Sequence, residues 1–435
     1  RGQWGKPRAG SSPAFGTKTN DKEISMMVKS LKIVLLFIGI ASAQSPDELY
    51  KTAQANLDAG KVSEAESGFN SALQTDPTFA PAYLGLAHTS MRMGDLAKTG
   101  KLLNEAIEIE PENQSFRDES ERLSELNTLM SKGKRQLQNG DADEAFETFR
   151  IALDKFPNYP GAAFSIGVTH LRAKKFEDAV TYFRKTIDIY PDHPKAHSAI
   201  NNVAKNYFLM GLQLYKRGDL DGALSSWSNA LDVDKAFHQA HYQIGVIQSK
   251  MGDKDAAILS YENALKINPQ FYKGYFSLGL AKSSMNDNDG ALSALQSAVD
   301  IKPDYDKAYG AMGDIYIRTG NYEKAKQVLN MANPNYARGY SLLGIIYADE
   351  KNWDMAISTL KKAVTLNDKD SMSFFRLASA YNSNGNCGGA KEAARKSADL
   401  KSRFGGSWFE LGVAEWCGGR GNKAGALNAF EKARN

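Results

Sequence analysis

A pattern of small, large and turn-forming residues recurs along this chain at intervals of 34 residues. Residues 242–269 hold one clear copy, and residues 276–303 repeat its order of aromatic, Gly, Ala and Pro positions. Eleven copies can be placed, and they start near residues 46, 80, 126, 160, 204, 238, 272, 306, 337, 371 and 405. Because a repeat of this length is one supersecondary unit that buries its apolar face only against its neighbours, the chain is expected to fold as a stack of such units.

Each copy carries two small residues and one large residue at fixed positions, and packing explains all three. Only a small side chain fits where the first helix of a copy comes closest to the second, and these positions hold Ala53, Ala87, Gly133, Gly167, Gly211, Gly245, Gly279, Gly313, Gly344, Ala378 and Gly412. A second small residue recurs early in the second helix as Ala65, Ala145, Ala179, Ala223, Ala257, Ala291, Ala325, Ala356, Ala390 and Ala426, and only Thr99 departs. Four residues later comes a large filler: Phe69, Leu103, Phe149, Phe183, Trp227, Tyr261, Leu295, Leu329, Leu360 and Phe430. Small residues against large ones are how closely packed helix pairs interdigitate.

A proline ends many of the second helices, at Pro77, Pro111, Pro157, Pro191, Pro269 and Pro303. Together these positions resemble the tetratricopeptide repeat (TPR) family, and the resemblance covers essentially all of residues 44–435. It implies an all-α fold, an α-α superhelix (a TPR solenoid) of about eleven helix-turn-helix repeats, with protein or peptide partners.

Two insertions interrupt the regular spacing. Twelve extra residues, 114–125, precede the third copy, and ten, 194–203, precede the fifth. Apolar residues continue through both at helical spacing, so each insertion is predicted to extend the following first helix. Over-long helices would disturb the stacking and could divide the solenoid into blocks 46–113, 114–193 and 194–435.

The first 43 residues have a different character. Residues 1–25 show no apolar periodicity and are interpreted as an upstream, non-native segment. Residues 26–43 have basic Lys29 and Lys32, an apolar run over 33–40 and Ala41-Ser42-Ala43 before Gln44, which predicts a secretory signal peptide. The run is about half of the roughly 20 residues that span a bilayer, so a membrane anchor is the weaker interpretation. Export to a periplasm or to the exterior is expected, with no membrane span after cleavage.

Removal of this leader changes the charge of the protein. The whole chain has 54 basic and 50 acidic residues, whereas residues 44–435 have 47 basic and 48 acidic ones. The excess of positive charge therefore lies in the leader, and net charge gives no reason to expect a nucleic-acid partner.

The resemblance also implies that the first helices line a concave groove faced by the fifth residue of each copy. The predicted partner-binding residues there are Tyr50, Leu84, Phe164, Phe208, Tyr242, Phe276, Phe375 and Phe409, while the remaining copies have Met130, Gly310 and Ser341. Rigid rings supply contact area for an extended peptide or a helix at low entropic cost. The alternative is that these rings pack between neighbouring repeats, and one residue can do both.

Little in the sequence predicts chemistry. The residues Asp287-Asn288-Asp289-Gly290 resemble part of a calcium loop, but Met285 stands where the first ligand should be and no Glu follows at the required place. The pairs His193/His197 and His238/His241 lack the further ligands that zinc needs. No enzyme, cofactor or metal site is therefore predicted.

The two cysteines occupy equivalent turns of the tenth and eleventh copies. Cys387 follows Asn386 and Cys417 follows Trp416, with glycines after both. Equivalent turns of adjacent repeats are neighbours, so a disulfide between Cys387 and Cys417 is predicted for an oxidising compartment. The alternative is two free, partly buried thiols.

These features favour an exported, non-catalytic scaffold or adaptor for protein partners. No capping helix follows the second helix of the eleventh copy, and truncation of the sequence is the simpler explanation. The other explanation is that another copy fills this face, so the second interpretation is a self-assembling structural protein. A homo-oligomer is therefore the alternative arrangement. An enzyme is the least favoured class, since the repeats use up the chain.

Overall fold

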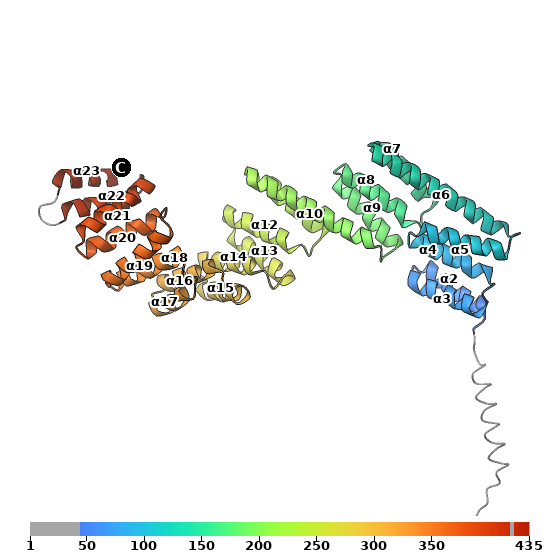
Figure 1. The fold of residues 1–435 in the computed structure, drawn as a ribbon, viewed down its shortest axis with the longest axis horizontal. Coiled ribbons are helices and arrows are strands. Elements are labelled where there is room, and N and C mark those ends of the chain that lie inside the picture. Colours follow the sequence, from blue (N-terminus) through green and yellow to red (C-terminus); the bar gives the residue numbers. More distant parts are fainter. Residues whose placement is uncertain (1–43, 418–421, 435) are drawn as a thin grey trace, which may run out of the picture. The chain divides into compact units, whose positions relative to one another are not determined.

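The computed structural model describes residues 44–417 and 422–434, so the predicted signal peptide lies outside the described residues. The described part is all α-helical and contains 22 helices that follow one another as antiparallel pairs (Figure 1). The helices are α2 (Pro46–Asp58), α3 (Val62–Thr75), α4 (Ala80–Arg92), α5 (Leu96–Ile109), α6 (Gln114–Asn139), α7 (Ala142–Lys155), α8 (Pro160–Arg172), α9 (Phe176–Ile189), α10 (Pro194–Arg217), α11 (Leu220–Val233), α12 (His238–Met251), α13 (Lys254–Ile267), α14 (Tyr272–Ser284), α15 (Asn288–Ile301), α16 (Asp306–Arg318), α17 (Tyr322–Asn330), α18 (Ala337–Asp349), α19 (Trp353–Leu366), α20 (Ser371–Ser383), α21 (Cys387–Leu400), α22 (Gly405–Trp416) and α23 (Lys423–Arg434). The predicted all-α fold of about eleven helix-turn-helix repeats is confirmed.

The turn inside each repeat has a local chemical cause. In the sixth repeat Gly252 ends α12 with a φ of 88°, a left-handed conformation that glycine adopts without a steric penalty. The next residue, Asp253, accepts a hydrogen bond from the backbone N–H of Ala256 at 3.1 Å and so caps α13. Asp287 caps α15 in the same way through the N–H of Gly290, at 2.9 Å. The segment that resembles a calcium loop is thus a helix cap.

The small and large positions meet as the sequence pattern predicts. A Cβ atom added to Gly245 would lie 2.7 Å from the ring of Tyr261, so no larger residue fits there. The fillers Phe69, Phe149 and Trp227 have no exposed surface. Burying a side chain of this size contributes on the order of 2–3 kcal/mol, and a core of this type recurs from repeat to repeat.

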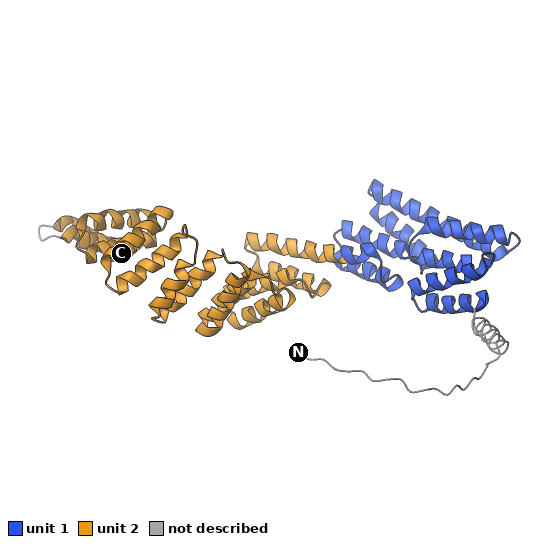
Figure 2. Cartoon of the chain, turned by 60° about the horizontal axis from the view of Figure 1, so that its bottom comes forward, with its two compact units in different colours: residues 1–198 blue, residues 199–435 orange. Residues whose placement is uncertain are grey.

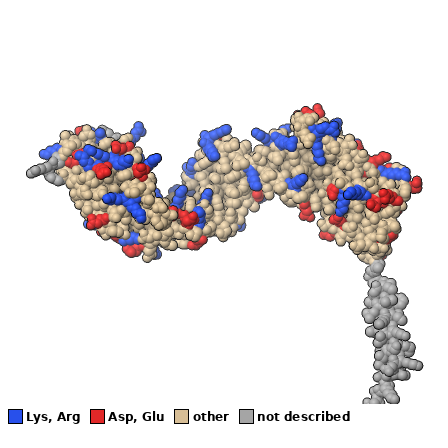
Figure 3. All heavy atoms as spheres, viewed as in Figure 1, with Lys and Arg blue, Asp and Glu red and all other residues tan. Residues whose placement is uncertain are grey.

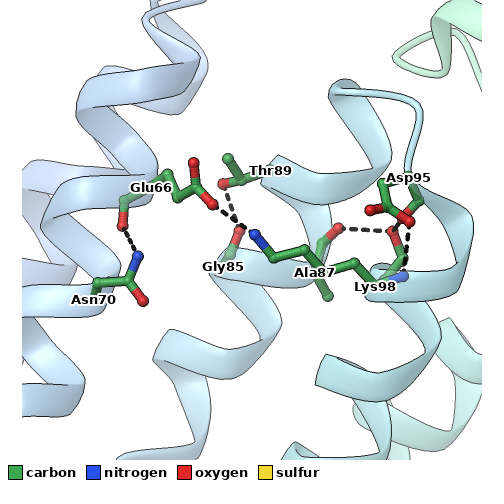
Figure 4. Close-up of polar contacts among 8 residues, drawn as sticks. Glu66, Asn70, Gly85, Ala87, Thr89, Asp95 and Lys98 are labelled. Carbon is green, nitrogen blue, oxygen red and sulfur yellow. Dashed lines mark hydrogen bonds and ion pairs between the residues drawn. The ribbon is translucent and has the colours of Figure 1, made fainter.

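Thr99, the single departure from the small-residue pattern, is accommodated without an unsatisfied hydroxyl. It is fully buried, and its Oγ1 donates to the carbonyl oxygen of Asp95 at 2.8 Å. On the same helix, Lys98 Nζ reaches back to Glu66 Oε1 at 2.6 Å and joins α5 to α3 (Figure 4). A buried hydroxyl is tolerated here because the preceding turn of its own helix accepts its proton.

The long helix α6 has one continuous apolar stripe that packs against two repeats. Phe116 and Leu123, in its first half, are buried against the second repeat, where Leu123 packs with Leu103. Leu126, at its middle, packs with Phe149 of the third repeat. Leu123 and Leu126 are three residues apart and therefore lie on the same side of the helix, so successive parts of one stripe meet different repeats. The insertion thus extends α6 as predicted, and one helix closes the second repeat and opens the third.

The chain divides into two compact units, residues 1–198 and residues 199–435, and the division falls within α10 (Figure 2). The second predicted insertion, at 194–203, is part of this continuous helix. The three predicted blocks stay a prediction.

Within each unit, the first helices of adjacent repeats contact one another. The pairs are α2 with α4 and α6 with α8 in residues 1–198, and α12 with α14, α14 with α16, α16 with α18, α18 with α20 and α20 with α22 in residues 199–435. The second helices of adjacent repeats make no comparable contact among the described residues. Because the first helices are closer together than the second helices, they line the inner side of the curve in each unit.

Candidate functional site

The predicted partner-binding residues all lie on the inner side of their own unit, on α2, α4, α8, α10, α12, α14, α20 and α22, and we call the surface around them, taken separately in each unit, the inner face. The first seven, from Tyr50 to Phe375, are half-buried. Phe409, on α22, is 53% exposed. Each residue therefore presents part of its surface to solvent and buries the remainder.

The buried parts of these rings pack on the fillers of their own repeats. The ring of Tyr242 lies 5.7 Å from that of Tyr261, and the ring of Phe164 lies 5.4 Å from that of Phe183. Tyr50 meets Phe69, Phe208 meets Trp227 and Phe409 meets Phe430 in the same way, with centroids 5.5, 6.3 and 5.8 Å apart. Contacts of this kind stabilise the repeat whether or not a partner is bound.

A second set of rings, which the sequence analysis missed, covers the same residues from the connection to the next repeat. The centroid distances are 5.9 Å for Tyr50–Phe79, 5.1 Å for Phe164–His193, 5.1 Å for Phe208–Phe237, 5.0 Å for Tyr242–Phe271, 5.2 Å for Phe276–Tyr305 and 5.0 Å for Phe375–Phe404. The available signal was an aromatic residue or His that stands 29 positions after each of these residues. These rings are therefore structural between repeats, and only their exposed edges are left for a partner.

The row of fifth-position rings stops in the eighth and ninth repeats, where Gly310 and Ser341 stand. Ser341 is 2% exposed, and its Oγ accepts a hydrogen bond from Arg376 Nη1 at 2.9 Å and shares a hydrogen bond of 2.8 Å with Ser373 Oγ. Arg338 of α18 pairs with Asp314 of α16 at 2.5 Å. The inner face of residues 199–435 is thus aromatic in part and charged in part.

A smaller recess opens on the inner face of residues 1–198. It has a volume of about 250 Å³ and is lined in part by Gln54, His88, Glu119 and Arg122. Glu119 lies 3.8 Å from His88 and 2.7 Å from Arg122, and the contact with His88, followed by the charge of Arg122, lowers the pKa of Glu119. Arg122 also lies over the ring of Phe156, 5.7 Å from its centroid. The recess thus contains a paired carboxylate, while Arg92 in its wall donates to the carbonyl oxygen of Leu57 at 2.6 Å.

A larger groove of about 900 Å³ lies on the opposite side of the tenth repeat, between α19 and α21. Its floor includes Phe374, Leu377 and Tyr381, while α21 contributes the small residues Gly389 and Ala393. No fifth-position residue lines this groove, so it is separate from the inner face.

The two cysteines are joined by a disulfide in the structure. The Cα atoms of Cys387 and Cys417 lie 5.7 Å apart, within the range of protein disulfides, and the bond links the first residue of α21 to the residue after α22. Beside it, Glu415 is 7% exposed and pairs with Lys391 at 2.8 Å and with Arg395 at 3.1 Å. The last two repeats are therefore tied by a covalent bond and by ion pairs between the buried Glu415 and two cations that are more exposed.

Other kinds of site find no support in the described residues. No group of three or more His, Cys, Asp or Glu side chains is placed to hold a metal ion there. No helix in the described part of the chain is long and apolar enough to cross a membrane. Both signs of charge occur on the face of each unit that Figure 3 shows.

Family models now identify the architecture. Models described as tetratricopeptide repeat match residues 56–117, 130–194, 238–271, 284–346 and 337–370, and one described as TPR repeat matches 211–252. The chain belongs to the tetratricopeptide repeat family. TPR proteins act in general as protein-protein interaction scaffolds and are typically non-catalytic.

Individual relatives of this TPR protein are distant. The protein CTR9 homolog of Arabidopsis thaliana is 24% identical over 125 residues, which are 29% of this chain and 11% of that protein. Superkiller protein 3 of Schizosaccharomyces pombe is 23% identical over 211 residues, 47% of this chain and 15% of that protein. The chain thus spans less than a sixth of the length of either relative. Yeast Tom70 is 16% identical, with 90% of this chain and 89% of that chain covered at a TM-score of 0.39.

Proposed function

We propose that this TPR protein is an exported, non-catalytic scaffold that binds an extended peptide or a helix of a protein partner along its inner face. The inner face supports this because it combines half-buried rings, held rigidly by their neighbours, with apolar side chains that remain exposed. Leu280, at the ninth position of the seventh repeat, is 45% exposed, and Phe409 is 53% exposed. Surfaces with rigid apolar anchors bind partners with little loss of side-chain entropy.

Capture of a partner by residues 44–435 from native extract tests this proposal. The rings themselves are unsuitable for substitution because they hold the repeats together, so Leu280→Glu is used to place a charge on the inner face without disturbing the core. Leu259→Glu is the matched control, since Leu259 is 61% exposed on the second helix α13. We expect a partner that is captured by the wild type and by Leu259→Glu and is lost with Leu280→Glu. Equal capture by both variants would place binding elsewhere.

Export is part of the proposal, through the signal peptide at residues 26–43 and into a periplasm or the exterior. The basic, apolar and A-x-A parts of that segment support it. Amino-terminal sequencing of the protein from the host envelope or medium is expected to begin at Gln44. An uncleaved chain recovered from the cytosol would contradict it.

The alternative, head-to-tail assembly of copies, has less support because the two end faces do not match. In the interior first helices other than the long α6 and α10, the third, seventh and tenth residues are for the most part buried against the preceding repeat, as Ala82 and Leu86 are. The equivalent residues of α2 are Glu48, Thr52 and Ala55, which are all exposed. Leu427, on α23, is apolar and 61% exposed. In a head-to-tail contact, the apolar face of α23 would therefore meet the polar face of α2. Light scattering of residues 44–435 is expected to give a mass that does not change with concentration.

A further inference from the structure

In the eighth and ninth repeats, Gly310 and Ser341 interrupt the row of fifth-position rings, and polar groups stand where rings stand in the neighbouring repeats. Tyr242, Phe276, Phe375 and Phe409 stand at the fifth positions on either side of it. Where a side chain of residue 310 would lie, the hydroxyl of Tyr336 fills the space. The inner face therefore changes chemistry over these repeats while its backbone continues in the same pattern.

Arg376, at the sixth position of the tenth repeat, is the charged group of this interruption that lacks an ion-pair partner. Its guanidinium donates to Ser341 Oγ at 2.9 Å, and no carboxylate among the described residues lies within the 4.0 Å of an ion pair. Burial lowers the pKa of Arg376, which means that the charge is partly desolvated. The nearby Asp370 is engaged with Ser373 Oγ at 2.5 Å and with the N–H of Met372 at 3.1 Å. A desolvated cation with one neutral hydrogen-bond partner is stabilised by any anion that reaches it.

The neighbouring charges restrict where that anion can lie. Arg338 already has Asp314 as its partner at 2.5 Å, so this pair has no net charge. Glu410, one repeat further on, is 9% exposed and accepts a hydrogen bond from Asn382 Nδ2 at 2.7 Å, with no Lys or Arg within ion-pair distance among the described residues. Arg376 in the tenth repeat and Glu410 in the eleventh thus both lack an ion-pair partner among the described residues, although the charges of Asp370 and Asp314 also act on Arg376.

We propose that the interruption around Ser341 and Arg376 is a subsite for one acidic side chain of an extended, otherwise apolar peptide segment. Guanidinium groups bind carboxylates through two parallel hydrogen bonds, and Ser341 already holds Arg376 in one orientation. Adjacent packed helices lie roughly 10 Å apart and an extended chain advances roughly 3.3 Å per residue, so neighbouring first helices are about three residues apart along a bound peptide. Glu410 repels a second acidic residue at that distance and favours a basic one, which sets the register of the peptide. The inference rests on the proposed function of the inner face.

Selection of a random dodecapeptide library displayed on phage against residues 44–435 tests the subsite. The wild type is expected to enrich peptides with one Glu or Asp between apolar residues, with a basic residue about three positions away. Arg376→Gln is expected to lose the preference for the acidic residue and to keep the preference for apolar ones. Lys361→Gln, which removes an exposed cation from the second helix α19, is the matched control and should select as the wild type does.

The enriched peptide then serves as the probe for affinity. Fluorescence anisotropy should show that Arg376→Gln weakens the Glu-containing peptide at least about tenfold and leaves its Gln analogue unchanged, because only the charged pair is lost. Arg376→Lys should lie between the two, since it keeps the charge and loses the paired hydrogen bonds. Circular dichroism confirms that the variants remain folded.

The outcomes separate this inference from the proposal beneath it. If Leu280→Glu abolishes the enrichment of apolar peptides, the inner face remains the binding surface. The subsite is nevertheless overturned if those peptides show no preference for an acidic residue, or if Arg376→Gln keeps that preference. If the wild type enriches no peptide beyond those that Leu280→Glu selects, the subsite and the proposed function are both overturned.

Discussion

The indole Nε1 of Trp227 donates a hydrogen bond to the carbonyl oxygen of Phe208, 3.0 Å away. Trp227 is the filler of the fifth repeat and has no exposed surface, whereas Phe208 is a half-buried residue of the inner face. The largest filler of the chain thus packs beneath an inner-face residue and also bonds to its backbone. The contact between Trp227 and Phe208 therefore fills the core of this repeat and also holds an inner-face residue in place.

Replacement of Trp227 by Phe is expected to destabilise the fifth repeat by about 1–3 kcal/mol. The change leaves a cavity and removes the hydrogen bond to Phe208. Urea unfolding followed by circular dichroism measures the effect as a lower midpoint. Trp416→Phe, at a position that is 58% exposed, is the matched control and should leave the midpoint unchanged. Equal effects of the two changes would show that Trp227 does not carry this packing.

The disulfide between Cys387 and Cys417 is expected to be present in the exported protein. Titration of the denatured, unreduced chain with a thiol reagent should detect no free thiol, and two free thiols would contradict the pairing. The bond closes a loop over a sequence separation of 30, for which chain entropy predicts a contribution of about 3–4 kcal/mol. Reduction, or Cys387→Ser, should therefore speed amide hydrogen exchange in α22 and α23 and leave α2–α5 unchanged.

The stability of the last repeats should depend on pH through Glu415. The hydrogen bond and charge of Lys391, together with Arg395, lower the pKa of Glu415 in the folded protein. A carboxylate with a lowered folded pKa stabilises the fold above its unfolded pKa of about 4.3, and this contribution disappears as the pH falls through the folded value. The Tm of the wild type should therefore fall from about pH 5 downward.

In Glu415→Gln, the Tm at pH 7 should be lower and its fall below about pH 5 should be shallower, because no carboxylate remains there to be protonated. Glu431→Gln, at an exposed position of α23, should follow the wild type. Parallel curves for the wild type and Glu415→Gln would mean that other groups set the acid sensitivity.

The sequence predicted the fold well because each repeat satisfies local rules. The small position at Gly245 and the large one at Tyr261 follow from the contact of two helices, and the turn at Gly252 follows from its backbone conformation. These interactions join residues of one repeat, so their spacing in the chain reveals them.

The candidate site was predicted only in part, because its polar contacts join different repeats. Ser341 and Arg376 are 35 positions apart, and nothing in either repeat alone indicates that one will donate to the other. The second layer of rings, such as Phe271 over Tyr242, was equally regular in sequence, but its packing role depends on how one repeat is rotated against the next. The rotation of one repeat against the next depends on tertiary packing, and the identity of a single residue does not reveal it.

The apolar stripe of α6 gives the last prediction. Leu123 and Leu126 are three residues apart on one helix, and they are 6% and 0% exposed. Leu123 packs with Leu103 of the second repeat and Leu126 packs with Phe149 of the third, so each Leu→Ala change leaves a cavity in a different core. Each is expected to cost about 2–5 kcal/mol.

Hydrogen exchange followed by mass spectrometry distinguishes the two cores. Leu123→Ala should speed exchange in α4 and α5, whereas Leu126→Ala should speed it in α7 and α8, because a repeat array transmits a loss of packing mainly to the nearest neighbours. Leu129→Ala is the control for a half-buried residue of the third-repeat core, three positions after Leu126, and should produce a smaller effect than Leu126→Ala. If both changes instead loosen the same set of helices, α6 joins the second and third repeats into one core. The insertion of twelve residues would then lengthen the helix without separating the cores of these two repeats.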